Sequence, residues 1–158
     1  MLFMRDSDII KQVEDVTGYS VKRWPICKDT TTSMTVPYLK TIYLAKHVWD
    51  GPNFLAVLGH EADHACRQYL DPFYLFKYLF KPSYRLSDEI SGEAVETAVR
   101  AILNRVPWDF EGLLSCVSTS LGTGRYCLKM TNDEKTELHK TIANEALKKR
   151  AHWYLRLL

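Results

Sequence analysis

The sequence predicts an α+β domain in which a first helix and a small, mostly antiparallel sheet precede a series of helices. Apolar residues recur with helical spacing over residues 6–16, and Gly18 follows as a stop. Short runs rich in β-branched and aromatic residues then predict three strands, at 19–24, 34–36 and 41–45. With 158 residues, the chain has the size of one compact domain.

The second part of the chain is expected to be helical. Asn53 can cap a helix that runs to about Leu70, and further helices are expected over 87–104, with Ser87 as a possible cap, and over 110–121. Thr131 and Glu134 form a capping box that opens a last helix. We therefore expect one domain over 1–158, with a core at about 6–104 and a helical C-terminal extension at about 108–158.

An aromatic segment, residues 73–84, separates the first two of these helices. Its simplest interpretation is that it packs over the core. The alternatives are a membrane-interface helix and the wall of a substrate groove.

Composition and charge give no indication of several classes of protein. The net charge of +2 requires neither a nucleic-acid partner nor an anionic membrane. Charged residues at the start of the chain argue against a signal peptide, and no run of eighteen apolar residues predicts a transmembrane segment. We expect a cytoplasmic or virion-associated protein. The four cysteines lack C-x-x-C spacing, which argues against a cysteine-type zinc site.

A possible metal site lies in the helix that follows Asn53. His60, Glu61 and His64 form an H-E-x-x-H motif, and residues four apart lie on the same side of a helix. Both imidazoles can therefore reach one Zn²⁺, while Glu61 lies where a general base can take a proton from a metal-bound water. The alternative is a helix that carries two exposed histidines.

Zinc held by two histidines needs a third protein ligand, which must come from further along the chain. Arg67 and Leu70 stand where a longer histidine motif would have its glycine and third histidine, so that motif is excluded. The available acids lie on the helix expected over 87–104: Glu89, Glu93 and Glu96. Without the upstream motif, these acids would be interpreted as a solvated stripe paired with Arg100.

An H-E-x-x-H helix preceded by a small sheet and followed by a helix that supplies a glutamate resembles the gluzincin branch of the zinc metallopeptidases. The stretch from Arg85 to Glu93 is similar to the second helix of minimal versions in short bacterial and bacteriophage proteins. The resemblance implies a zincin-like fold in which Glu89 is the third ligand. It places Gly92 where the family has a packed alanine, and Glu93 where a side chain accepts a histidine N–H. In the alternative register, Glu93 is the ligand.

The resemblance implies a zinc peptidase that acts on peptide or protein substrates. Its transition state also needs an oxyanion donor, and the candidates are Tyr84, Arg85, Tyr126 and His139. In this fold, the strand at Thr41–Leu44 would be an edge strand that aligns an extended peptide. The rival hypothesis is a zincin-like structural module that works with other proteins of an assembly, such as a phage particle. A third hypothesis is a helical interaction protein without a metal.

Overall fold

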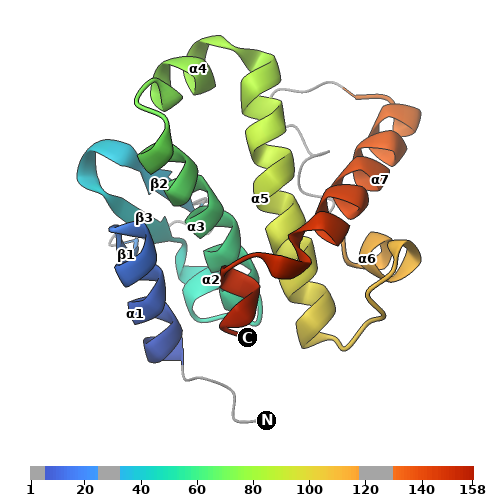
Figure 1. Cartoon of the computed structure of the whole chain (residues 1–158), viewed down its shortest axis with the longest axis horizontal. Helices are drawn as coiled ribbons and strands as arrows, with labels where there is room; N and C mark the ends of the chain where they lie inside the picture. The colour runs from blue at the N-terminus through green and yellow to red at the C-terminus, as the bar shows by residue number, and fades with distance from the viewer. Residues whose placement is uncertain (1–5, 25–32, 118–129) are drawn as a thin grey trace.

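A computed structural model describes residues 6–24, 33–117 and 130–158. The fold is α+β and mostly helical, with one three-stranded sheet (Figure 1). The sheet lies on one side of helix α3 (Phe54–Leu70), and α5 (Pro82–Leu103) lies on the other side. Helix α7 (Asn132–Lys148) then packs against the far side of α5, so that α5 occupies the middle of the molecule.

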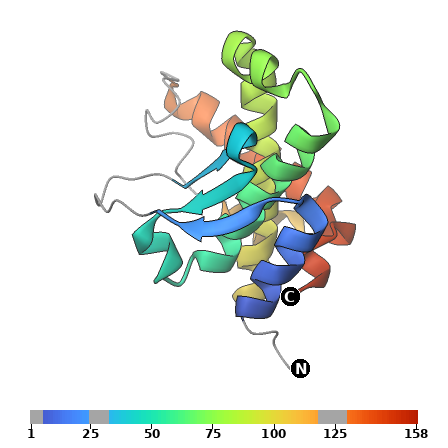
Figure 2. The same ribbon diagram turned by 90° about the vertical axis from the view of Figure 1, so that its left-hand side faces the viewer.

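The sheet is mixed, not mostly antiparallel as predicted. Its strands are β1 (Ser20–Arg23), β2 (Met34–Val36) and β3 (Thr41–Leu44), in the order β1-β3-β2. Strand β3 pairs with β1 in parallel and with β2 in antiparallel orientation (Figure 2). The pattern of alternating residues predicts strands but carries no information on their relative direction, which depends on the path of the connections.

The prediction that Thr41–Leu44 forms an edge strand is wrong. This segment is the central strand β3, and three of its four side chains are buried. The edge strand that contacts α3 beside the H-E-x-x-H motif is β2, where Thr35 pairs with Ile42 of β3.

The N-terminal helix agrees with its predicted bounds. Helix α1 (Asp6–Thr17) buries Ile9 and Val13, and Gly18 ends it with a φ of 69°, a conformation that favours glycine. The short helix α2 (Lys46–Trp49) connects the sheet to α3. Helix α3 begins directly after Asn53, but the Asn53 side chain makes no capping hydrogen bond.

The helix predicted over 87–104 begins five residues earlier. Pro82 is in the first turn of α5, where its missing N–H costs no hydrogen bond, and Lys81 precedes it in extended conformation. Ser87 is therefore an interior residue of α5 and not its cap. The additional residues bring the aromatic segment next to the H-E-x-x-H motif, because α4 (Tyr74–Phe80) leads directly into α5.

The C-terminal helices pack on α5. Helix α6 (Phe110–Cys116) is shorter than predicted because it ends before Val117, and Asp109 caps it by accepting a hydrogen bond from the amide of Gly112. The predicted capping box of α7 is confirmed by reciprocal bonds between Thr131 and Glu134. Two single turns of 3-10 helix follow, η3 (Lys149–Ala151) and η4 (Tyr154–Arg156).

The main core contains residues from both ends of the chain. Ile9 and Val13 of α1 belong to the same buried cluster as Ala146 of α7 and as Tyr154 and Leu155 of η4. The last residues of the chain therefore take part in the packing of the motif helix. Among the residues that the structure describes, no helix combines the length and apolar character that crossing a membrane requires.

The expectation that the aromatic segment packs over the core is wrong for most of its side chains. Tyr74 is buried, and Tyr78 lines a cavity. Phe73, Phe76 and Phe80 are between 59% and 68% exposed.

Candidate metal centre

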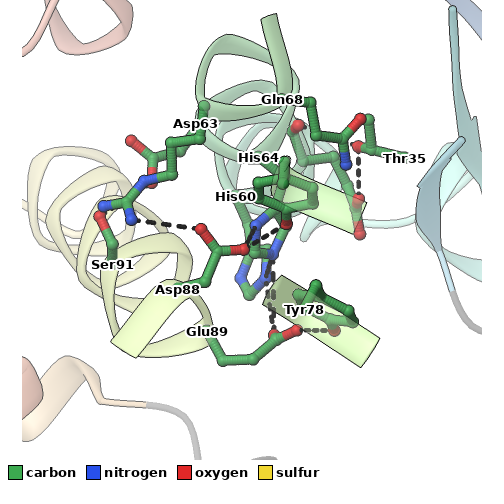
Figure 3. A network of polar contacts seen from close by, with 12 residues as sticks. Thr35, His60, Asp63, His64, Gln68, Tyr78, Asp88, Glu89 and Ser91 are labelled. Carbon is green, nitrogen blue, oxygen red and sulfur yellow. Dashed lines mark hydrogen bonds and ion pairs between the residues drawn. The ribbon is translucent and has the colours of Figure 1, made fainter. Parts of the chain in front are cut away.

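Helices α3 and α5 bring two histidines and several acids together in a buried cluster (Figure 3). The Nε2 atoms of His60 and His64 face each other at 3.0 Å. The two side chains are only 7% and 6% exposed, which excludes the alternative of a helix carrying two exposed histidines. Two buried imidazole nitrogens at this distance are suitably placed to bind one ion.

Glu89 completes a group of three ligand atoms. Its Oε2 lies 3.5 Å from Nε2 of His60 and 3.7 Å from Nε2 of His64. This Oε2 atom is buried and has no hydrogen-bond partner among the described residues. Ligands at about 2.0 to 2.2 Å from a tetrahedral ion are separated by about 3.4 Å from one another. The three separations between ligand atoms are 3.0, 3.5 and 3.7 Å, which lie on both sides of this value. The three residues therefore fit a zinc ion.

The other nitrogen of each ring lies near a second carboxylate. Nδ1 of His64 is 2.7 Å from Oδ2 of Asp88, and Nδ1 of His60 is 3.4 Å from Oε2 of Glu96. Carboxylates in these positions would orient the rings so that each Nε2 is available to a bound ion. Asp88 is itself held by Arg67, at 3.2 Å, and by the hydroxyl of Tyr74.

Glu93 is only 2% exposed and lies about one helical turn after Glu89 on α5. With His60 and Glu96 it forms a second group whose ligand atoms lie within 4.8 Å of one another. The structure thus brings Glu89 to both histidines, and it groups Glu93 with His60 alone.

Gly92 leaves space for the ring of His60. A Cβ atom at position 92 would lie 2.7 Å from Nε2 and 2.8 Å from Cδ2 of this imidazole. Contacts this short do not occur between packed atoms, so His60 occupies its position only because residue 92 has no side chain.

Electrostatics in the cluster favour a bound cation. Burial by itself lowers the pKa of His64, but the carboxylates of Asp88 and Glu89 outweigh burial and raise this pKa to about 9. Burial likewise opposes the shift at His60, where Glu89 and Glu96 raise the pKa well above its ordinary value. The pKa of Glu89 is held below its ordinary value, despite its burial, by the two histidines. The carboxylates therefore create a strongly negative environment around both rings.

Glu61 lies beside the three ligand atoms and lines the same cavity. Thr35 of β2 approaches it from the sheet, with Oγ1 at 2.8 Å from Oε2 and 3.0 Å from the backbone oxygen of Glu61. Burial raises the pKa of Glu61, while His60 and His64 act in the opposite direction. A carboxylate with a raised pKa is better matched to proton transfer near neutral pH.

Tyr78 contributes a hydroxyl from α4. This hydroxyl donates a hydrogen bond to Oε1 of Glu89, and the ring lines the cavity (Figure 3). Burial and the charge of Glu89 raise the pKa of Tyr78, so that the hydroxyl keeps its proton and remains a donor.

The four predicted oxyanion donors have different locations. Arg85 lines the cavity. Tyr84 donates a hydrogen bond to Asp71 at 3.2 Å and does not line the cavity, and His139 lies half-buried on α7 away from it. Tyr126 lies outside the described residues.

The cavity has a volume of about 660 Å³. The edge strand β2 and helices α2 to α5 all contribute to its wall. This volume is in the range of small-ligand sites, and one side of the cavity is formed by the edge strand β2, which pairs with β3 alone among the described residues.

Sequence reasoning missed three residues of the site: Thr35, Tyr78 and Asp88. Asp88 precedes the expected ligand and would point to another side of α5, and no spacing rule connects Thr35 or Tyr78 to α3. Glu96 was available as an acid, and its seven-residue distance from Glu89 places both on one face of a helix. That spacing was the one signal that could have identified Glu96 as a partner of a histidine.

Comparisons of the chain with protein-family models, curated proteins and solved structures found no match.

Proposed function

We propose that this protein is a zinc-dependent peptidase of the zincin type, with His60, His64 and Glu89 as the protein ligands. The observation that supports the proposal most strongly is the convergence of these three ligand atoms next to Glu61 in one cavity. A purely structural zinc site has four protein ligands and no need for a base. Here three ligand atoms lie within 4.8 Å of one another and their residues line the cavity, so a bound ion would have space for a water as its fourth ligand.

Zinc bound by these residues would supply a Lewis acid for the scissile carbonyl and would lower the pKa of a bound water toward 7. Glu61 would take one proton from the attacking water as its oxygen bonds to the carbonyl carbon. Glu61 would then deliver this proton to the departing nitrogen when the C–N bond breaks. The products are a carboxylic acid and an amine, which after exchange of the remaining proton are a carboxylate and an ammonium group.

The proposed donor to the developing oxyanion is the neutral hydroxyl of Tyr78, with the cationic Arg85 as a second donor in the cavity. We no longer propose Tyr84 and His139 as oxyanion donors, because these two residues do not line the cavity. For this role the Tyr78 hydroxyl would exchange its bond to Glu89 for one to the substrate. The substrate backbone would pair with the exposed edge of β2, which gives little sequence preference.

Glu61→Gln tests the proposed base. We expect hydrolysis of fluorescently labelled casein or of a diverse peptide library to fall by about 10²- to 10⁴-fold, with the zinc content unchanged. Glu137→Gln is a matched control, because the Glu137 side chain lies 71% exposed on α7. We expect this control to hydrolyse like the parent protein.

The same experiment separates the peptidase from its rivals. Equal cleavage by the parent and Glu61→Gln, insensitive to chelators, would show that the hydrolysis comes from a contaminant. A zinc-loaded parent protein that cleaves nothing in the library would instead favour a structural component of an assembly.

A further inference from the structure

Six large apolar side chains around helix α4 are exposed on one part of the surface. We call them the α4 ridge. They come from the last residues of α3, the following turn and α4, and are between 57% and 78% exposed: Tyr69, Leu70, Phe73, Phe76, Leu79 and Phe80.

The α4 ridge is large for a surface patch. A single aromatic side chain presents roughly 150 to 250 Å², so the four aromatic side chains of the ridge present on the order of 500 Å² at these exposures, and the two leucines add to this area. The largest apolar patch of a typical monomer is about 300 to 600 Å², and larger patches mark sites of interaction. An interaction partner for the ridge is therefore expected.

The shape of the molecule restricts the kind of partner. Helix α4 stands at the end of the molecule opposite to both chain termini, and it projects beyond the neighbouring elements in both views (Figures 1 and 2). A projecting helix can enter a soft, extended surface without obstruction from the rest of the protein. The interfacial layer of a lipid bilayer is such a surface.

The charge around the ridge is complementary to an anionic surface. Residues 69–87 contain three cations, Lys77, Lys81 and Arg85, and a single acid, Asp71, which gives a local charge of +2. Asp71 is already paired with Lys77 at 2.7 Å and accepts a hydrogen bond from Tyr84. Lys81 lies exposed at the end of α4, beside Phe80.

We propose that the α4 ridge binds the surface of an anionic lipid bilayer, with its phenylalanine and leucine side chains in the interfacial layer. Lysine stems can lie along apolar surface while their ammonium groups reach lipid phosphates, as expected for Lys81. A second copy of the chain fits less well, because a twofold axis at the ridge would bring the cations of both copies together. Binding to lipid is independent of hydrolysis, but it would hold the nearby cavity close to the membrane.

Vesicle sedimentation tests the proposal with the full chain. We expect the protein to bind vesicles of phosphatidylcholine with 30% phosphatidylserine and to bind pure phosphatidylcholine more weakly. Phe76→Ser with Phe80→Ser removes two exposed rings whose centroids lie 5.0 Å apart. We expect this double variant to lower the partition coefficient at least about tenfold.

A second variant and a matched control make the test specific. Lys81→Glu is expected to weaken binding to the anionic vesicles about fivefold, without a core side chain being altered. Val16→Ser with Leu103→Ser also removes two exposed apolar side chains, 52% and 37% exposed, but these lie on α1 and at the end of α5, outside the ridge. This control is expected to bind like the parent, and circular dichroism checks that all variants are folded.

Two results would overturn the proposal. The first is the absence of binding to anionic vesicles, or equal binding by the parent and the phenylalanine variant. The second is a dimer in sedimentation velocity that Phe76→Ser with Phe80→Ser dissociates, in a protein that does not bind vesicles. That second result would assign the α4 ridge to a contact between two copies.

Discussion

The individual residues of the candidate metal centre are unusual in their burial. Six acids on α3 and α5 are at most 7% exposed: Glu61, Asp63, Asp88, Glu89, Glu93 and Glu96. Arg67 and Arg100 pair with some of them at the edge of the cluster. A buried charge without compensation costs several kcal/mol, so a divalent cation between Glu89 and the histidines would stabilise the folded chain.

Gly92→Ala tests how closely His60 is positioned. The added methyl group would lie 2.7 Å from Nε2, so the ring must move away from its place opposite His64. We expect zinc affinity to fall at least about tenfold and peptide hydrolysis about 100-fold. The measurement is the difference between the unfolding midpoints of zinc-loaded and chelated protein. An unchanged difference would mean that His60 is not a ligand.

The sequence allowed some of these residues to be predicted, and the structure indicates why others could not be. His60, Glu61 and His64 follow from helical spacing within one element. Glu89 came from a resemblance, because spacing alone does not distinguish it from Glu93. Thr35 reaches Glu61 across 26 residues of sequence, and only the packing of β2 against α3 brings the two together.

At the scale of elements, the last two turns of the chain support the motif helix. Tyr154 of η4 is fully buried, and its hydroxyl donates a hydrogen bond of 2.8 Å to the carbonyl oxygen of Leu55 in α3. Its ring occupies the space beside Gly59, where a Cβ atom would lie 2.7 Å from Cε1. Lys149 and His152 also approach Asp63 of α3, at 3.4 and 3.2 Å.

Substitutions of Tyr154 test this support. We expect Tyr154→Phe to cost about 1 kcal/mol of unfolding free energy through the lost hydrogen bond, and Tyr154→Ala about 3 to 5 kcal/mol through the cavity it leaves. Urea denaturation measures both, with the exposed Arg156→Ala as the control. A cost below about 1 kcal/mol for Tyr154→Ala would show that the C-terminal turns do not hold α3.

The sequence predicted the helices better than the sheet. The stop at Gly18 and the capping box at Thr131 are local signals, and both are confirmed. The order and direction of the strands depend on contacts between distant residues, so a mostly antiparallel sheet was predicted where a mixed one exists. Pro82 is compatible with a first helical turn, but the more familiar cap signal at Ser87 favoured a later start.

At the scale of the whole molecule, the net charge does not describe how charge is distributed over the fold. The chain carries +2 in total, which by itself indicates no particular partner. The fold separates this charge into a negative cluster between α3 and α5 and a cationic, apolar ridge at α4. The proposed zinc site lies in the negative cluster, and the proposed lipid-binding surface is the α4 ridge.

Removal of zinc is expected to destabilise the whole molecule, because the proposed ion binds only the folded chain. At a free zinc concentration of 100 times Kd, the ion would contribute about 2.7 kcal/mol, or roughly 5 to 10 °C in Tm for a domain of this size. Calorimetry before and after chelation, followed by addition of zinc, measures the shift and its reversal. An identical Tm in both states would contradict a zinc site coupled to folding.

We propose that one zinc ion lies between α3 and α5, bound by His60, His64 and Glu89. Anomalous diffraction at the zinc absorption edge, from crystals grown with zinc, tests it most directly. We expect one peak at about 2.0 to 2.2 Å from Nε2 of both histidines and from Oε2 of Glu89. The absence of a peak between the histidines, or a peak whose nearest carboxylate is Glu93, would contradict it.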